Sequence, residues 1–252
     1  MLGVTGVSVA EGSLVAVATG AAGFVNAVAG GGSLVSYPAL LATGLSPLSA
    51  NVTNTLAIWP GYLGGAGALA ADLDREDRRL PRLAIAAALG AVGGSALLLG
   101  TDPDVFEVVV PYLVLLSAVL LALPSPWMAR LRRRAERPAM SVVTVALAGA
   151  YGAYFGGGLG VILLAVLSLF VGGDLRGVNP VKAALALLVN TIALVSFVGF
   201  APVSWGVAAV GAPAALLGGV AGGRCSARID GRLLRRLVVA FSVAVGVALL
   251  VR

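Results

Sequence analysis

Apolar stretches of membrane-spanning length follow one another along almost the whole chain, and this pattern constrains the fold more than any other feature. Of the 252 residues, 59% are hydrophobic and 11% are charged, whereas a soluble domain carries about 25% charged residues. A membrane-spanning helix needs about 20 predominantly apolar residues in succession. The sequence therefore predicts an all-α, polytopic helical membrane protein. The apolar stretches cover residues 12–29, 33–44, 49–71, 83–100, 105–124, 140–155, 159–171, 181–200, 204–223 and 237–251.

The charged residues are gathered in a few segments between these stretches. Arginines are concentrated in residues 72–82, 125–140 and 224–236, whereas residues 100–107 contain three acids and no base. Lys and Arg favour the cytoplasmic side of a membrane, so the three basic segments are predicted to be cytoplasmic. The same bias accounts for the net charge of +6 without a nucleic-acid partner. We expect a multi-pass protein of the cytoplasmic membrane with both termini external.

The residue types that the chain lacks exclude several kinds of chemistry. It contains no histidine and one cysteine, Cys225, so neither a His/Cys zinc site nor a Ser–His or Cys–His catalytic pair can form. We therefore expect no metal, no cofactor and no enzymatic activity. A Ser–Lys pair that uses Lys182 is the remaining catalytic alternative, and no serine motif supports it. Ten of the eleven acids lie in loops, which disfavours a buried proton relay and leaves a coupling role open for Glu11.

Two glycine triplets indicate an internal repeat. Gly23 to Val35 (GFVNAVAGGGSLV) aligns with Gly149 to Val161 (GAYGAYFGGGLGV), with six identical positions. When the basic segments are placed inside, each triplet joins two apolar segments that enter and leave on the same side, and three spans follow each pair. Three spans reverse the side, so the second repeat is predicted to be inverted, a recurring plan of secondary transporters. The predicted units are residues 1–124, a cytoplasmic basic linker at 125–139, and residues 140–252.

The broken segments predict where a substrate binds. Non-helical backbone at membrane depth is tolerated where it is buried in protein or lines a cavity. Half-helices that begin near Ser33 and Leu159 would direct the positive ends of their dipoles inward, which favours an anion. The alternative interpretation is close helix packing through small residues. We favour packing for the glycine pairs at 61/65 and 90/94, and a substrate site for the two triplets.

Polar side chains near the triplets complete the predicted site. Lys182 is the only lysine in the chain and, when one residue of drift is allowed, stands at the place that Thr55 occupies in the first repeat. Its charge would compensate that of an anion, or its ammonium would extend to the lipid headgroups. Asn54 and Asn190 lie within predicted spans and should face the bundle interior, either for the substrate or as helix–helix contacts. The predicted substrate-binding residues are Gly30, Gly31, Gly32, Ser33, Asn54, Thr55, Gly156, Gly157, Gly158, Lys182 and Asn190.

Two motifs resemble the sulfite exporter TauE/SafE family of permeases. The first is G-F-x-x-x-x-A-G-G-G-S-L-x-x-x-P-A-L-L-x-x-G-L-S-P from Gly23 to Pro47, followed by A-N-V-T-N-T-L at residues 50–56. The second, weaker motif spans residues 149–158, with Lys182 and Asn190 after it, and departs from the family at Gly157, where many members carry a proline. The resemblance covers nearly the whole chain. It implies transport of small sulfur-containing anions or organic acids, often outward.

The sequence thus predicts a secondary transporter or facilitator of small anions across the cytoplasmic membrane. The resemblance narrows the substrates to sulfur oxyanions or organosulfonates of the sulfite type. A permease for other organic acids and a non-transporting membrane scaffold or partner subunit are the alternatives. A scaffold does not need exposed backbone at the membrane midplane, so the broken segments disfavour it. The expected partners are a small anionic substrate and the lipid bilayer, and a homodimer through glycine-rich faces is left open.

Overall fold

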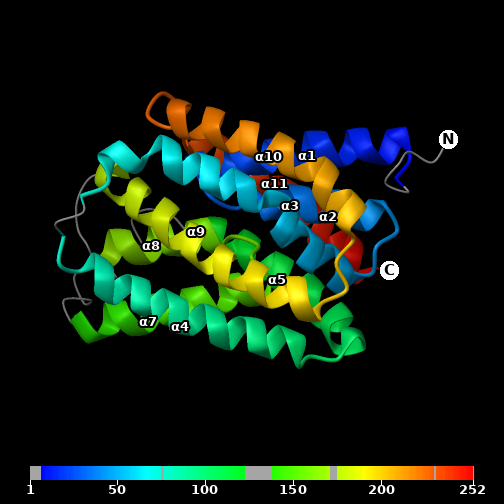
Figure 1. Cartoon of the computed structure of the whole chain (residues 1–252), viewed down its shortest axis with the longest axis horizontal. Coiled ribbons are helices and arrows are strands. Elements are labelled where there is room, and N and C mark those ends of the chain that lie inside the picture. The colour runs from blue at the N-terminus through cyan, green and yellow to red at the C-terminus, as the bar shows by residue number, and fades with distance from the viewer. Residues whose placement is uncertain (1–6, 75–76, 123–137, 171–174, 230, 252) are drawn as a thin grey trace.

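Helices make up every regular element of the computed structural model, which describes residues 7–74, 77–122, 138–170, 175–229 and 231–251 (Figure 1). The all-α expectation is therefore confirmed. The first half contains α1 (Val9–Val28), α2 (Ser33–Ala42), α3 (Pro47–Ala68), the 3-10 turn η1 (Ala70–Asp72), α4 (Leu80–Leu99) and α5 (Pro103–Ala122). The second half contains α7 (Pro138–Tyr154), α8 (Leu159–Phe170), α9 (Leu175–Phe200), α10 (Trp205–Cys225) and α11 (Gly231–Leu250).

The length and surface of these helices are those of a membrane protein. Within the described residues, five helices are long and apolar enough to cross a membrane: α1, α4, α5, α9 and α10. Large apolar side chains on their outer faces are exposed, such as Leu89 at 69% and Leu217 at 72%. Apolar surface of this extent needs a non-aqueous environment. The predicted polytopic membrane protein is thereby confirmed, whereas the sides on which the termini lie stay predictions. Most of the predicted basic linker, residues 125–139, lies outside the described residues.

Both glycine triplets interrupt the helices as predicted. Gly30, Gly31, Gly156 and Gly158 have φ values of +80°, +88°, +76° and +80°, a left-handed conformation that glycine adopts at no steric cost. These residues end α1 and α7 and allow α2 and α8 to turn back. The returning helices α2 and α8 have 10 and 12 residues, which is too short for a full crossing. Each half of the chain therefore begins with a broken hairpin.

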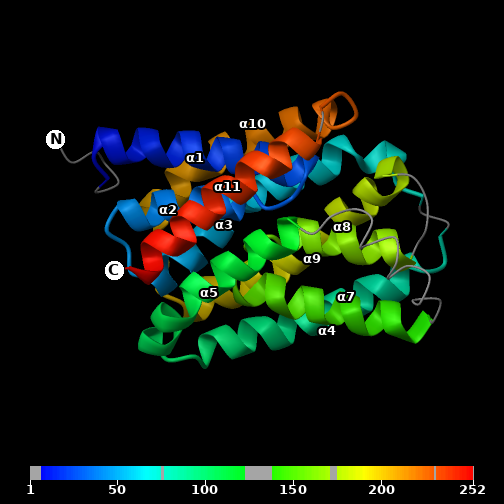
Figure 2. The same cartoon turned by 180° about the vertical axis from the view of Figure 1, so that it is seen from behind.

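The helices form two groups, and each group takes helices from both halves of the chain (Figures 1 and 2). Helix α10 packs on α1 and α3, while α4 packs on α7 and α9. The groups meet where α3 packs on α9 and where α5 packs on α11. In Figure 1, α1 begins at the right of the bundle and α7 at the left. This pairing is what an inverted repeat would produce, and the inverted relation of the two halves stays a prediction from the sequence.

Small residues allow these helices to approach closely. A β-carbon placed on Gly61 would lie 2.7 Å from the carbonyl oxygen of Ala215. On the other side of the molecule, a β-carbon on Gly90 would lie 1.9 Å from the carbonyl oxygen of Ala146. Membrane helices associate through such small residues because hydrocarbon provides no hydrophobic drive between them. The packing interpretation of both glycine pairs agrees with this geometry.

Candidate functional site

The two glycine breaks meet inside the bundle, backbone against backbone. A β-carbon on Gly30 would lie 2.6 Å from the carbonyl carbon of Gly160, and one on Gly160 would lie 2.8 Å from the Cα atom of Gly30. The Oγ atom of Ser33 lies 3.8 Å from the place of a β-carbon on Gly156. The beginnings of α2 and α8 are therefore neighbours. The structure brings the two predicted triplets together and leaves no room between Gly30 and Gly160 in this conformation.

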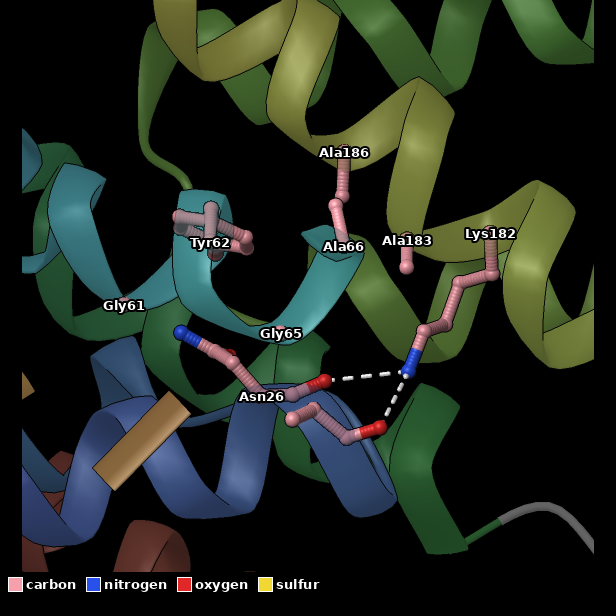
Figure 3. Close-up of a pocket in the computed structure, with 9 residues that line it drawn as sticks. Asn26, Gly61, Tyr62, Gly65, Ala66, Lys182, Ala183 and Ala186 are labelled. Carbon is pink, nitrogen blue, oxygen red and sulfur yellow. Dashed lines mark hydrogen bonds between the residues drawn. The ribbon is translucent and has the colours of Figure 1, made fainter. Parts of the chain in front are cut away.

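A buried lysine lies beside this contact. Lys182 of α9 is 1% exposed, and its Nζ atom donates hydrogen bonds to the carbonyl oxygens of Asn26 at 3.0 Å and Ala27 at 3.2 Å (Figure 3). Both carbonyls belong to the last turn of α1, at the negative end of its dipole. Among the described residues, the hydrogen-bond partners of this ammonium group are backbone carbonyl oxygens and include no carboxylate. The side chain thus ends inside the protein, and the alternative in which it extends to the headgroups does not hold.

Asn26 connects the lysine to the first glycine break. Its side-chain oxygen accepts a 2.6 Å hydrogen bond from the backbone N–H of Gly32, just before α2. Its backbone oxygen accepts the bond from Lys182. The side-chain nitrogen Nδ2 is buried and has no hydrogen-bond partner within the described residues. We did not predict a role for Asn26, although a lone asparagine in an apolar stretch was a visible signal.

A small pocket opens between α1, α3 and α9 beside these groups. In Figure 3 the side-chain nitrogen of Asn26 points toward Gly61 and Tyr62 of α3. The side chain of Tyr62 is buried in the wall of this pocket, with 6% of its surface exposed. The residues that line the pocket are Asn26, Ala27, Gly61, Tyr62, Gly65, Ala66, Lys182, Ala183 and Ala186.

The remaining predicted polar residues are buried and engaged. The side-chain oxygen of Asn54 accepts a 2.6 Å hydrogen bond from the hydroxyl of Ser36. Asn190 donates to the carbonyl oxygen of Ala186 at 2.9 Å within its own helix. Both asparagines face the bundle interior as predicted, each with 2% of its surface exposed. The hydroxyl of Thr55 bonds the backbone of its own helix, at the carbonyl oxygen of residue 51.

Hydroxyl groups hold the second glycine break. Ser117 of α5 donates a 2.8 Å hydrogen bond to the carbonyl oxygen of Gly157. Its hydroxyl oxygen is also hydrogen-bonded to the hydroxyl of Tyr151, and the carbonyl oxygen of Leu113 lies 3.3 Å from the Tyr151 oxygen. We did not predict roles for Ser117 and Tyr151, because nothing in the sequence indicates that α5 reaches this turn. All partners in this cluster are uncharged.

Comparisons with known proteins place the chain among membrane transporters. A family model described as "Sulfite exporter TauE/SafE" matches residues 15–249. The "Probable membrane transporter protein ORF9" of Sinorhizobium sp. is 29% identical, and the alignment covers 91% of this chain and 88% of that protein. A "Probable membrane transporter protein" of Haemophilus influenzae is 29% identical, with coverages of 88% and 87%. The "Probable membrane transporter protein YfcA" of Escherichia coli K12 is 26% identical, with coverages of 91% and 86%. No solved structure matches.

Proposed function

This chain belongs to the sulfite exporter TauE/SafE family, and on that premise we propose that it is a secondary transporter or facilitator that moves small anions across the cytoplasmic membrane. The proposed substrates are sulfur oxyanions or organosulfonates, and sulfite is the first to test. The proposed substrate site consists of both glycine triplets together with Ser33, Asn54, Thr55, Lys182 and Asn190.

The burial of Lys182 beside the meeting point of the two breaks is the observation that carries this proposal. Taking an ammonium group out of water costs several kcal/mol, and the partners of this one are carbonyl oxygens without a full charge. A bound anion would supply the missing counter-charge. The beginnings of α2 and α8 add the positive ends of two helix dipoles nearby. A scaffold would gain nothing from a buried cation at this place.

The same contacts bear on the catalytic alternative. A Ser–Lys enzyme needs the lysine nitrogen within hydrogen-bond reach of a serine hydroxyl. The Nζ atom of Lys182 is bonded to backbone carbonyl oxygens. The Ser–Lys alternative therefore has no geometric support, and transport is the function that we propose.

Flux measurements in proteoliposomes test the proposal. Purified protein would be reconstituted, and uptake of radiolabelled sulfite, sulfate, thiosulfate and methanesulfonate measured under an imposed membrane potential without a pH gradient. We expect the flux of at least one sulfur anion to increase with a potential that is positive inside, while protein-free liposomes stay at background. Flux of acetate or another organic acid alone would contradict the sulfur substrates. The absence of any anion flux, with or without a pH gradient, would contradict the proposed transport.

A further inference from the structure

We propose that Lys182 takes up a proton when an anion binds beside it and releases that proton when the anion leaves. The proton comes from water on the side where the anion enters and returns to water on the opposite side. One proton thus crosses the membrane with each anion, in the same direction. This inference rests on the proposed function and identifies its coupling ion.

The hydrogen bonds of Lys182 suit both protonation states of its side chain. A neutral amine has two N–H groups and a lone pair, and the carbonyl oxygens of Asn26 and Ala27 accept two hydrogen bonds from Nζ (Figure 3). An ammonium group has three N–H groups, so the third is left for an anion. Loss of the proton therefore leaves both contacts with the end of α1 in place.

The surroundings of Lys182 make its ammonium form costly until an anion arrives. The side chain is buried, and removing an ammonium group from water costs several kcal/mol. In this conformation the backbone contact between Gly30 and Gly160 leaves no room for an anion at the meeting point of the breaks, so the neutral amine fits it well. A bound anion supplies a full opposite charge, which favours proton uptake at Nζ, and its departure favours proton release.

The neighbouring helices bring no second charge to Lys182 within the described residues. Lys182 lies beside α1, α3 and α8. Helices α3 and α8 contain no charged residue, and α1 contains only Glu11, in the turn farthest from Asn26. Tyr62 of α3 is the other titratable residue of the pocket, and within α9 the side chain of Arg176 lies outside the described residues. On the other elements that pack on α9, the charged or titratable residues are Asp72, Arg82, Tyr151 and Tyr154, and none of them lines the pocket.

The residue type at this position supports a group that can lose its proton. Of the 17 basic residues in the chain, Lys182 is the only lysine, and among the described residues it is the only buried one. An arginine keeps its charge in proteins, whereas a lysine can release its proton. A site that needed only a fixed positive charge could use either residue. The chain has no histidine, and its described residues include no buried acid, so Lys182 is the basic group that remains to carry a proton.

The first test measures the protonation of this lysine directly. Protein labelled with ¹⁵N-lysine, without lysine in its purification tag, gives one side-chain nitrogen resonance, and its chemical shift distinguishes an amine from an ammonium group. The Lys182→Met variant lacks the resonance and confirms the assignment. We expect the amine in anion-free protein at neutral pH, and the ammonium group after saturation with whichever of thiosulfate, sulfate or methanesulfonate is transported.

The second test measures whether protons and anions move together. Thiosulfate, sulfate and methanesulfonate carry no proton of their own at neutral pH, so acidification of the liposome lumen reports a coupled proton. With the membrane potential held at zero, we expect an inward gradient of the transported anion to bring in about one proton for each radiolabelled anion. Ser117→Ala, which keeps Lys182, should give the same ratio, whereas the residual flux of Lys182→Met should carry no proton.

The two tests separate the coupling from the proposed function. Proton and anion flux in equal amounts, with the proton flux lost in Lys182→Met, supports both. Anion flux without protons, an equal proton ratio in Lys182→Met, or an ammonium resonance that persists without an anion overturns the proton carrier and leaves the proposed transport standing. A wild-type protein that moves none of these anions, sulfite included, overturns the proposed function and the coupling with it.

Discussion

The two glycine breaks share a backbone plan but are held by different chemistry. At the first, Lys182 of α9 bonds the end of α1, and Asn26 bonds the N–H of Gly32. At the second, Ser117 of α5 bonds the carbonyl oxygen of Gly157 and the hydroxyl of Tyr151. In both cases a helix outside the hairpin supplies the group that holds the turn. The framework is therefore duplicated, while a full charge is placed at the first break.

The energetic consequences of the two arrangements differ. Hydroxyl groups are satisfied by carbonyl oxygens at little cost, so the cluster at the second break stabilises the fold. The cost of removing an ammonium group from water is only partly compensated when its hydrogen-bond partners are neutral, so the group lowers the stability of the fold. The first break thus contains a buried cation that costs stability, as binding sites often do, whereas hydroxyl groups that stabilise the fold hold the second break. The following substitutions compare the breaks directly.

The largest difference in the yield of folded protein and in flux is expected between the variants Gly30→Ala and Gly156→Ala. Both glycines have positive φ values, so the backbone strain of an alanine, about 1–2 kcal/mol, is common to the pair. A β-carbon on Gly30 would lie 2.6 Å from backbone atoms of α8, whereas the nearest atom to one on Gly156 is 3.4 Å away. We expect Gly30→Ala to abolish folded protein and flux, and Gly156→Ala to leave a folded transporter. Equal yields of monodisperse protein would show that the contact at Gly30 does not matter.

The next comparison exchanges Lys182 for methionine and Ser117 for alanine. Lys182→Met removes the desolvation cost of a buried charge but takes a donor from the carbonyl oxygens of Asn26 and Ala27. Because these two effects oppose each other, the variant should lose flux at least about tenfold with little change in its unfolding temperature. Ser117→Ala should keep most flux and lose about 1–3 kcal/mol of unfolding free energy, because two buried groups lose a partner. Flux and thermal unfolding of both variants are the measurements. The reverse pattern would assign the binding role to the second break.

The smallest loss of flux is expected for a change at Thr55, which the predicted repeat pairs with Lys182 when one residue of drift is allowed. Its hydroxyl bonds its own helix, so Thr55→Val removes one modest hydrogen bond and keeps the shape of the side chain. We expect anion flux to fall about two- to threefold, in line with about 0.5 kcal/mol. Flux equal to that of the wild type would remove Thr55 from the proposed site.

The features that could be predicted from the sequence are those with local causes. Apolar stretches, glycine triplets and short segments each act within a few residues, and α2 and α8 lie where the sequence placed half-helices. The burial of Asn54 and Asn190 also followed from their position in apolar spans. These signals depend on how a segment partitions into a membrane and on the conformations available to glycine.

The contacts that could not be predicted depend on which helices meet. From the sequence, the ammonium group of Lys182 could lie inside the bundle or extend to the lipid headgroups. The packing of α9 against α3 and the end of α1 places it inside. Ser117 finds its partners because α5 passes the turn between α7 and α8. Asn26 is different, because the argument applied to Asn54 and Asn190 would have identified it.

Each group contains helices from both halves of the chain, and this arrangement determines the order in which the helices can pack during synthesis. Helices α1 and α3 cover their glycine faces with α10, and the ribosome synthesises α10 near the end of the chain. Domains that fold during synthesis generally complete their amino-terminal part first. Here α1 and α3 cannot complete their packing until α10, which begins more than a hundred residues after α3, has been synthesised. During this interval the surfaces of α1 and α3 that later pack on α10 lack this partner helix. Two halves synthesised as separate polypeptides would still contain every surface that the assembled transporter needs.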